Sequence, residues 1–300
     1  MTIESEYMEK LKKMLEEGKI DQKTFEEITE RWGGENQSSN ENTEKEENGE
    51  RKTRSKRVKI SGAGRLSDVY SEELIISGSV TVDGLVDSNF IHISGAGHIN
   101  GDVKSLESIS VSGAAKIFGN IDGNAVNSSG SLKVSSIKCN TLDVSGGLEV
   151  KETIKADHLK ISGSVTTKDM DANIQKLSGS IKAETLKGEE IRIAGKIHVK
   201  EVSCKRFDME LYGQSSRIKT LEADAVEIKY GRGRLFDRFF LRQVEISEIH
   251  CKRASLEGVI SKSVWGDEIF VGSGCEIDYV EAKNIHISDG GIVKDKKIVS

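Results

Sequence analysis

The sequence predicts an all-β fold, a triangular β-helix (β-solenoid) of about 17 residues per coil, with a small α-helical hairpin at its N-terminus. The first reason is a triplet of an apolar residue, a small residue and glycine, which recurs every 16 to 18 residues. A period this short and steady is typical of a solenoid built from strands. The triplet glycines are Gly62, Gly78, Gly95, Gly113, Gly130, Gly146, Gly163, Gly179, Gly195 and Gly213.

The second reason is the pattern inside each coil. Ile-Arg-Ile at residues 191–193 precedes Gly195, and Ile-His-Val at residues 197–199 follows it. Alternation with a period of two, with β-branched residues inward, indicates strands. A second glycine column suggests another corner, because glycine adopts positive φ at a turn without steric cost. Its members, Gly84, Gly101 and Gly119, each lie six residues after a triplet glycine, which leaves a third side and predicts three short strands per coil.

Residues 1–33 have helical rather than strand spacing. Gly18 is suited to end a first helix, and Asp21 is a candidate N-cap for a second. A hairpin this small buries too little apolar surface to fold alone. We therefore expect its apolar side chains to contact the solenoid, a second copy of the chain or a partner protein. These hairpin contacts are Leu11, Leu15, Phe25, Ile28 and Trp32.

Residues 34–57 are predicted to form a disordered linker, because Asn, Ser, Glu and Gly dominate and no apolar residue is present to pack. Its basic end, residues 51–57, is interpreted either as a solvated run of charge or as a contact with an anionic membrane surface. No aromatic residue interleaves with these bases, and the net charge of the chain is −5. Nucleic acid is therefore not an expected partner.

The β-helix itself is expected over residues 58–297. Each coil of a solenoid bonds only to the coils before and after it, so only the two ends expose unpaired strand edges. The repeat pattern persists almost to both boundaries, which favours end-to-end stacking over a capped monomer. The predicted polymer contacts are Ile60 and Leu66 at one end and Ile285, Ile287 and Ile292 at the other.

Residues 231–242 interrupt the period with an amphipathic segment rich in arginine and phenylalanine. As a helix, the segment would place three arginines on one face and the apolar residues away from it. Three interpretations stay open: a cover for the side of the solenoid, an interfacial membrane helix, and a peptide that enters a partner's groove. The membrane or partner contacts are Arg234, Leu235, Phe236, Arg238, Phe239, Phe240 and Arg242.

Composition and motifs argue against several other classes of protein. The first ten residues do not resemble a signal peptide, and no run of 18 apolar residues is present to span a membrane. The four cysteines form no CxxC pair, so we expect free thiols and a cytoplasmic location. No catalytic, cofactor-binding or metal-binding residue is predicted, because the histidines are scattered and those within strands are expected to point to solvent.

Several parts of the sequence resemble known families. The Ser-Gly coils over residues 58–297 resemble bactofilins, the polymer-forming cytoskeletal proteins of bacteria. Residues 210–213 (Glu-Leu-Tyr-Gly), the Arg/Phe segment and residues 271–281 are similar to a Bacillus-type subgroup of bactofilin-like proteins. Residues 11–25 resemble the SHOCT-type helical hairpin.

The bactofilin resemblance implies a right-handed β-helix that polymerises without nucleotide through its terminal coils. It also implies a scaffold that positions other proteins, at the inner face of the membrane, in cell shape, motility or division. The alternative hypothesis is a monomeric β-solenoid adaptor that binds proteins through the hairpin and residues 231–242, and a β-helix enzyme is less favoured. The expected partners are therefore a second copy of the chain, proteins bound by the hairpin and a membrane surface contacted peripherally, with no cofactor.

Overall fold

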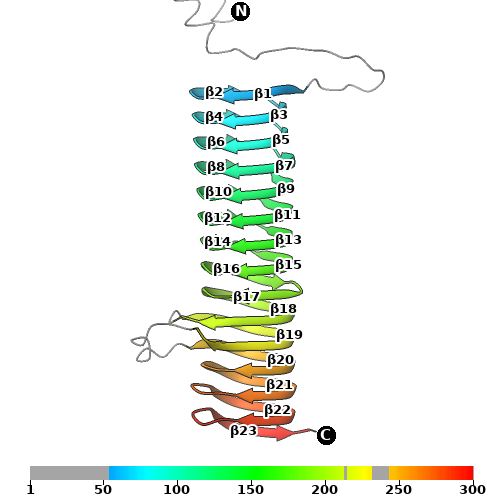
Figure 1. The fold of residues 1–300 in the computed structure, drawn as a ribbon, viewed down its shortest axis with the longest axis vertical. Helices are drawn as coiled ribbons and strands as arrows, with labels where there is room; N and C mark the ends of the chain where they lie inside the picture. The colour runs from blue at the N-terminus through cyan, green and yellow to red at the C-terminus, as the bar shows by residue number, and fades with distance from the viewer. Residues whose placement is uncertain (1–53, 213–214, 232–242, 300) are drawn as a thin grey trace, which may run out of the picture. The chain divides into compact units, whose positions relative to one another are not determined.

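The computed structural model describes residues 54–212, 215–231 and 243–299, which form a parallel β-solenoid (Figure 1). About 14 turns of about 16 residues stack along one axis, so the predicted all-β solenoid is confirmed. The turns are slightly shorter than predicted because several of them contain only 15 or 16 residues. Ile249, for example, pairs with Val264, only 15 residues further along.

Twenty-three strands build the stack, and each pairs in parallel with its equivalent one turn away. The early turns contain one longer strand, namely β1 (Ser55–Ile60), β3 (Val69–Ile76), β5 (Val86–Ile93), β7 (Val103–Val111), β9 (Asn120–Ser128), β11 (Ser136–Val144), β13 (Thr153–Ile161) and β15 (Asp169–Leu177), whereas the equivalent β17 (Glu190–Ile193) has only four residues. Between them lie β2 (Ala63–Leu66), β4 (Ser79–Val82), β6 (Ala96–Ile99), β8 (Ala114–Ile117), β10 (Ser131–Val134), β12 (Gly147–Val150), β14 (Ser164–Thr166) and β16 (Ser180–Lys187). The later strands bend around most of a turn: β18 (Lys196–Leu211), β19 (Ser216–Tyr230), β20 (Val244–Leu256), β21 (Val259–Val271), β22 (Glu276–Ile287) and the shorter β23 (Ile292–Ile298).

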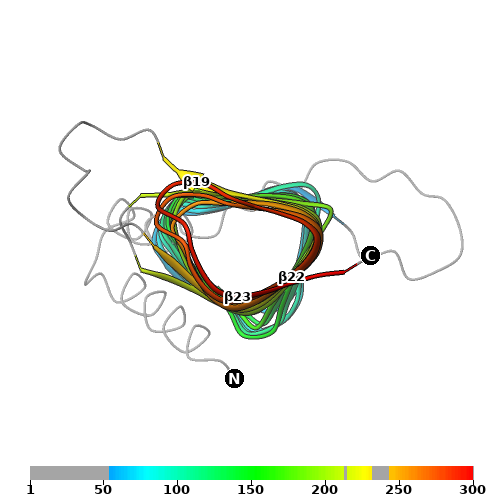
Figure 2. The ribbon, with the colours of Figure 1, turned by 90° about the horizontal axis from the view of Figure 1, so that it is seen from below.

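Each turn has three sides, which we number from the turn that β3 and β4 build. Side 1 carries the inward residues Val69 and Ser71, side 2 carries Leu74 and Ile76, and side 3 carries Val80 and Val82. The chain passes from side 1 to side 2 within β3, where two successive residues, Glu72 and Glu73, are not buried. Viewed along the axis, the turns outline a rounded triangle (Figure 2).

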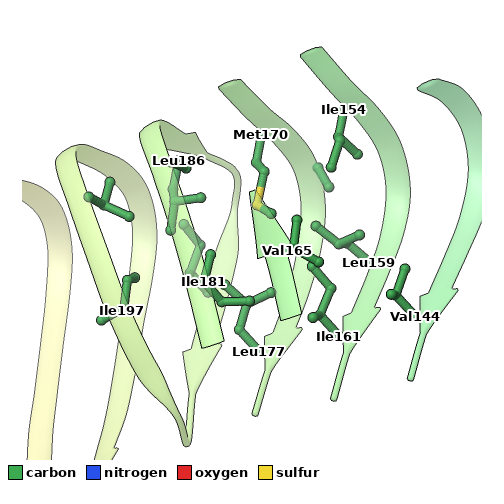
Figure 3. Packing of buried hydrophobic residues seen from close by; sticks show 14 of the residues in the cluster. Val144, Ile154, Leu159, Ile161, Val165, Met170, Leu177, Ile181, Leu186 and Ile197 are labelled. Carbon is green, nitrogen blue, oxygen red and sulfur yellow. The ribbon is translucent and has the colours of Figure 1, made fainter. Parts of the chain in front are cut away.

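Equivalent inward residues of successive turns stack into columns that form the core. Ile154, Met170 and Leu186 follow one another along side 1, and all three are completely buried (Figure 3). Burying one such side chain stabilises the fold by about 1.5–3 kcal/mol. The turns are therefore held together by continuous aliphatic columns rather than by any single contact.

From Gly78 to Gly195, the triplet glycines lie at the corner between sides 2 and 3, where the turns approach each other backbone to backbone. A Cβ added at Gly146 would lie 2.0 Å from the carbonyl oxygen of Gly130 and 2.5 Å from that of Ser129. Every other side chain would meet the same backbone atoms. Glycine recurs at this corner because no side chain fits between the turns.

The second glycine column follows the same rule, and the expectation that it supplies positive φ is wrong. A Cβ at Gly101 would lie 2.4 Å from the carbonyl oxygen of Gly84, and one at Gly84 would meet Asp68 Oδ1, which accepts a hydrogen bond from the backbone N–H of Leu85 at 2.9 Å. Among the glycines that the structure describes, positive φ occurs only at Gly258, Gly274 and Gly290, which belong to neither column.

The corner between sides 1 and 2 carries a ladder of polar side chains. Asn140 Nδ2 donates a hydrogen bond to Asn124 Oδ1, one turn back, at 2.9 Å. Further along, ion pairs replace the amides, as between Lys252 Nζ and Asp224 Oδ1 at 2.8 Å. An exposed pair of this kind contributes at most about 1 kcal/mol. Because each pair joins adjacent turns, the ladder favours pairing in register.

Two regions with predicted roles lie outside the described residues. They are the hairpin of residues 1–33, with its five contact residues, and residues 232–242, which include all the named contacts of the Arg/Phe segment. Of the linker expected over residues 34–57, only the last four residues are described. β1 begins at Ser55, three residues before the expected start of the β-helix at Val58.

Candidate functional site

The N-terminal end of the solenoid is an open strand edge. Among the described residues, β1 pairs only with β3 and β2 only with β4, so neither strand has a partner on its outer side. Their inward residues Val58, Ile60 and Leu66 lie at the tops of core columns and are half-buried. An unpaired edge above an apolar column is a template for a further strand.

The C-terminal end is also open and more apolar. β23 pairs only with β22, and in the described chain no strand follows the second half of β22 on side 2. Ile285 and Ile287 end the two columns of that side, and Ile287 is 40% exposed. Ile292 and Ile298 are 55% and 69% exposed. Isoleucines this exposed at one end form an apolar surface, and covering that surface lowers the free energy.

The structure places four of the five predicted polymer contacts on inward columns at the two ends. Ile60 stacks on Ile76, and Ile287 stacks on Val271. The fifth contact, Ile292, lies on the outer face of side 3, because it pairs with the exposed Glu276. The inward residue of this pair of strands is the next one along the chain, Val293, which stacks on Ile277.

Sequence analysis missed a charged residue at the C-terminal end. Lys296 pairs with Val280, which is completely buried, so it occupies the position that continues the first column of side 1. Ile298 pairs with the buried Ala282 and continues the second column of the same side. The signal for both is the alternation counted from Val293, which is obscured by the run of polar residues that follows it.

The N-terminal end is strongly basic. Residues 54–66 contain no acidic residue, and their bases are Arg54, Lys56, Arg57, Lys59 and Arg65. Arg65 donates to Asp83 in the next turn through Nε at 2.6 Å, and this hydrogen bond lowers the pKa of the Asp83 carboxyl. Arg54 and Arg57 also reach acidic residues of later turns. Lys56 and Lys59 make no ion pair with any residue that the structure describes, so this end keeps unbalanced positive charge.

Histidines on the outer faces take part in aromatic stacks. His250 stacks on Trp265 with ring centroids 4.4 Å apart, and His286 stacks on Phe270 at 4.7 Å. Burial and the nearby Lys196 lower the pKa of His198. In the described part of the chain, no group of three or more His, Cys, Asp or Glu side chains is placed to hold a metal ion.

The cysteines are structural residues in small core positions. Three of them lie in the second column of side 1, where the neighbours are also small: Cys139 pairs with Gly123, and Cys204 pairs with Ala223. Burial raises the pKa of the Cys139, Cys204 and Cys251 thiols to about 12. All four cysteines are free thiols, and burial also raises the pKa of Cys275.

We expect these thiols to be almost unreactive in the folded protein. A shift from the ordinary value to about 12 lowers the thiolate population near pH 8 by about a thousandfold. Titration with a chromogenic disulfide at pH 8 should detect close to no thiol in the native protein and all four after denaturation in guanidinium. Rapid native reaction of two or more thiols would show that this column opens in solution.

Comparison with protein-family models, curated proteins and solved structures finds no match to this chain. No helix in the described residues is long and apolar enough to cross a membrane.

Proposed function

We propose that this protein is a bactofilin-like cytoskeletal scaffold that self-assembles end to end without nucleotide. The observation that carries the proposal is that both ends of the described solenoid combine strand edges unpaired by any described residue with half-exposed inward residues, Ile60 and Leu66 at one end and Ile285 and Ile287 at the other. A second copy stacked on either end covers these residues and adds a new set of backbone hydrogen bonds. Assembly of this kind needs no ligand, because the solenoid already holds each edge in a strand conformation.

The proposal includes where the scaffold acts. We place it in the cytoplasm, as a right-handed β-helix that contacts the inner face of the membrane peripherally and positions other proteins there in cell shape, motility or division. The support is the resemblance of residues 58–297 to bactofilins together with the solenoid architecture. The hairpin and the Arg/Phe segment are the proposed attachment elements.

Negative-stain electron microscopy and sedimentation velocity of the full chain, without nucleotide or metal, test self-assembly directly. Filaments, or species larger than a monomer whose size rises with concentration at micromolar levels, are expected. A single species with the mass of one chain, at physiological salt and micromolar concentration, would refute the proposal.

One observation favours the alternative, a monomeric solenoid adaptor that binds proteins through the hairpin and residues 231–242. Lys296 projects along a core column at the C-terminal end, and an inward charge on an edge strand is a known device against edge-to-edge association. In an assembled polymer the Lys296 ammonium has to reach water along its flexible stem. Lys296 therefore either weakens the junction or blocks it.

Replacing Lys296 with leucine separates these two cases. Lys296→Leu continues the column above Val280, so end-to-end association should strengthen by tenfold or more, about 1.4 kcal/mol. Sedimentation velocity over a concentration series measures the change. Lys294→Leu is the matched control, because Lys294 lies on the outer face and pairs with Asp278 at 2.8 Å. Equal effects of the two substitutions would show that general surface hydrophobicity, not the column, drives association.

A further inference from the structure

We infer that copies of this chain join head to tail, because the two ends of the solenoid are the complementary edges of one interrupted turn. The inference depends on the proposed self-assembly and adds its polarity. Its physical basis is the side of the triangle on which each end stops.

The C-terminal end stops after side 1. β23 supplies side 3 of the last turn through Val293 and side 1 through Lys296 and Ile298. No described residue supplies side 2 of that turn, so Ile285 and Ile287 end the columns of side 2 one turn earlier. The last turn therefore has two of its three sides.

Apart from Ser55, which pairs with Ser71 on side 1, the N-terminal strand edge begins with the missing side. Val58 and Ile60 of β1 stack on Leu74 and Ile76, so they lie on side 2. Leu66 of β2 stacks on Val82 and lies on side 3. A second copy placed beyond the C-terminal end in the same orientation thus continues the chain of turns where the first copy stops.

This placement fixes the contacts at the junction. Val58 and Ile60 of the second copy stack on Ile285 and Ile287 of the first, at the spacing of adjacent strands, about 4.8 Å. Leu66 stacks on Val293 in the same way. Six apolar residues, five of them half-buried and the sixth the exposed Ile287, become parts of continuous columns. In this register, Ser55 of the second copy and Ile298 of the first would occupy the same position in the second column of side 1. The chain before Arg57 of the second copy therefore has to turn outward at the junction.

The charges also favour this polarity. A head-to-head junction brings the bases of two N-terminal ends together, and a tail-to-tail junction brings two copies of Lys296 together. Like charges at close range destabilise an interface. Head to tail, each basic end meets a single Lys296 on a surface that also carries Asp289 and Asp295.

Acidic residues of that surface are within arginine reach. Arg57 falls above Asn284, which lies one turn above Glu268, and Arg65 falls above Ile292, which lies one turn above Glu276. The structure already contains an arginine that spans two turns. Arg54 lies above Tyr70 and reaches past it to Asp87 and to Asn89, whose Oδ1 is 3.0 Å from Arg54 Nη1.

Cysteine cross-linking between single-cysteine additions tests the polarity. Lys59 and His286 are exposed residues in the same outward column of side 2, and the head-to-tail register places them directly opposite each other. Adjacent strands hold Cα atoms at a spacing that a disulfide accepts. We would oxidise Lys59→Cys alone, His286→Cys alone and their equimolar mixture with copper phenanthroline, and read the products on non-reducing gels. Lys176→Cys, in the same column at mid-solenoid, is the matched control.

Head-to-tail joining predicts a covalent dimer in the mixture and none with either variant alone, with Lys176→Cys or with wild type. A dimer from Lys59→Cys alone would establish head-to-head joining, and one from His286→Cys alone would establish tail-to-tail joining; either result overturns the inference while leaving self-assembly intact. Sedimentation of each variant first checks that it still assembles. A wild-type protein that does not associate refutes the proposed function and the inference together.

Discussion

Ile287→Arg is expected to abolish end-to-end assembly while leaving the solenoid folded. In the free protein, Ile287 is 40% exposed at the last position of its column, so an arginine can extend its guanidinium into water. Against another copy, the same charge is buried beneath a strand without a partner. An uncompensated buried charge costs about 3–5 kcal/mol, so association should weaken by about a hundredfold or more. Sedimentation velocity and electron microscopy measure this loss.

A matched substitution on the lateral surface controls for charge itself. Ile260 is 37% exposed, a fraction similar to that of Ile287. It lies on the outer face of side 3, beside Glu245 and Glu276. Ile260→Arg should therefore assemble like wild type. Thermal denaturation followed by circular dichroism should shift by only a few degrees for both variants. Filaments of normal length from Ile287→Arg would remove the C-terminal end from the assembly contact.

Gly146→Ala is expected to have the largest effect on stability. The added methyl group would lie 2.0 Å from the carbonyl oxygen of Gly130, and neither atom belongs to a flexible side chain that can move away. The turns must separate locally, which breaks the hydrogen bonds that cross this corner, such as Gly147 N–H to Gly130 O at 2.9 Å. We expect a loss of about 3–5 kcal/mol, at the upper end of single-substitution effects.

The neighbouring glycine provides the control. A Cβ at Gly147 meets no atom within 4 Å, so Gly147→Ala should be neutral or stabilise by up to about 1 kcal/mol through the unfolded chain. Thermal denaturation and hydrogen exchange of residues 128–163 distinguish the two variants. Because each turn contacts only its neighbours, the loss of protection in Gly146→Ala should be centred on these turns. Similar behaviour of both variants would contradict the close approach at this corner.

The solenoid could be predicted because the repeating positions each require a particular type of residue for a physical reason. Inward positions such as Ile76 and Ile93 need apolar side chains, and the adjacent corner accepts only glycine. The reason for the glycines could not be predicted. Positive φ and close approach select the same residue, and the observed φ angles together with the backbone contacts at Gly101 and Gly119 distinguish them.

The register of the end strands was harder to predict than that of the middle strands, because each described end strand pairs with a neighbour on one side only. Ile60 begins a clear triplet and Leu66 comes shortly after it, and both take the inward positions expected of them. At the other end, Ile292 and Val293 are both apolar and adjacent, and the sequence does not indicate which of them faces inward. Pairing with Ile277 selects Val293 and thereby places Lys296 in the core column.

The contact between Gly146 and Gly130 involves only adjacent turns and no more distant part of the chain. This local packing affects how the protein can change length during evolution. A deletion of residues 130–145 removes one whole period and brings Gly146 against Gly113, where an equivalent glycine already stood. The rod shortens by one step of about 4.8 Å, and every remaining contact keeps its chemistry. A deletion of one residue within a strand would turn the later inward residues of that strand outward. Genetic insertions and deletions in such a chain are therefore tolerated in units of one turn, and its length is inherited as a whole number of turns.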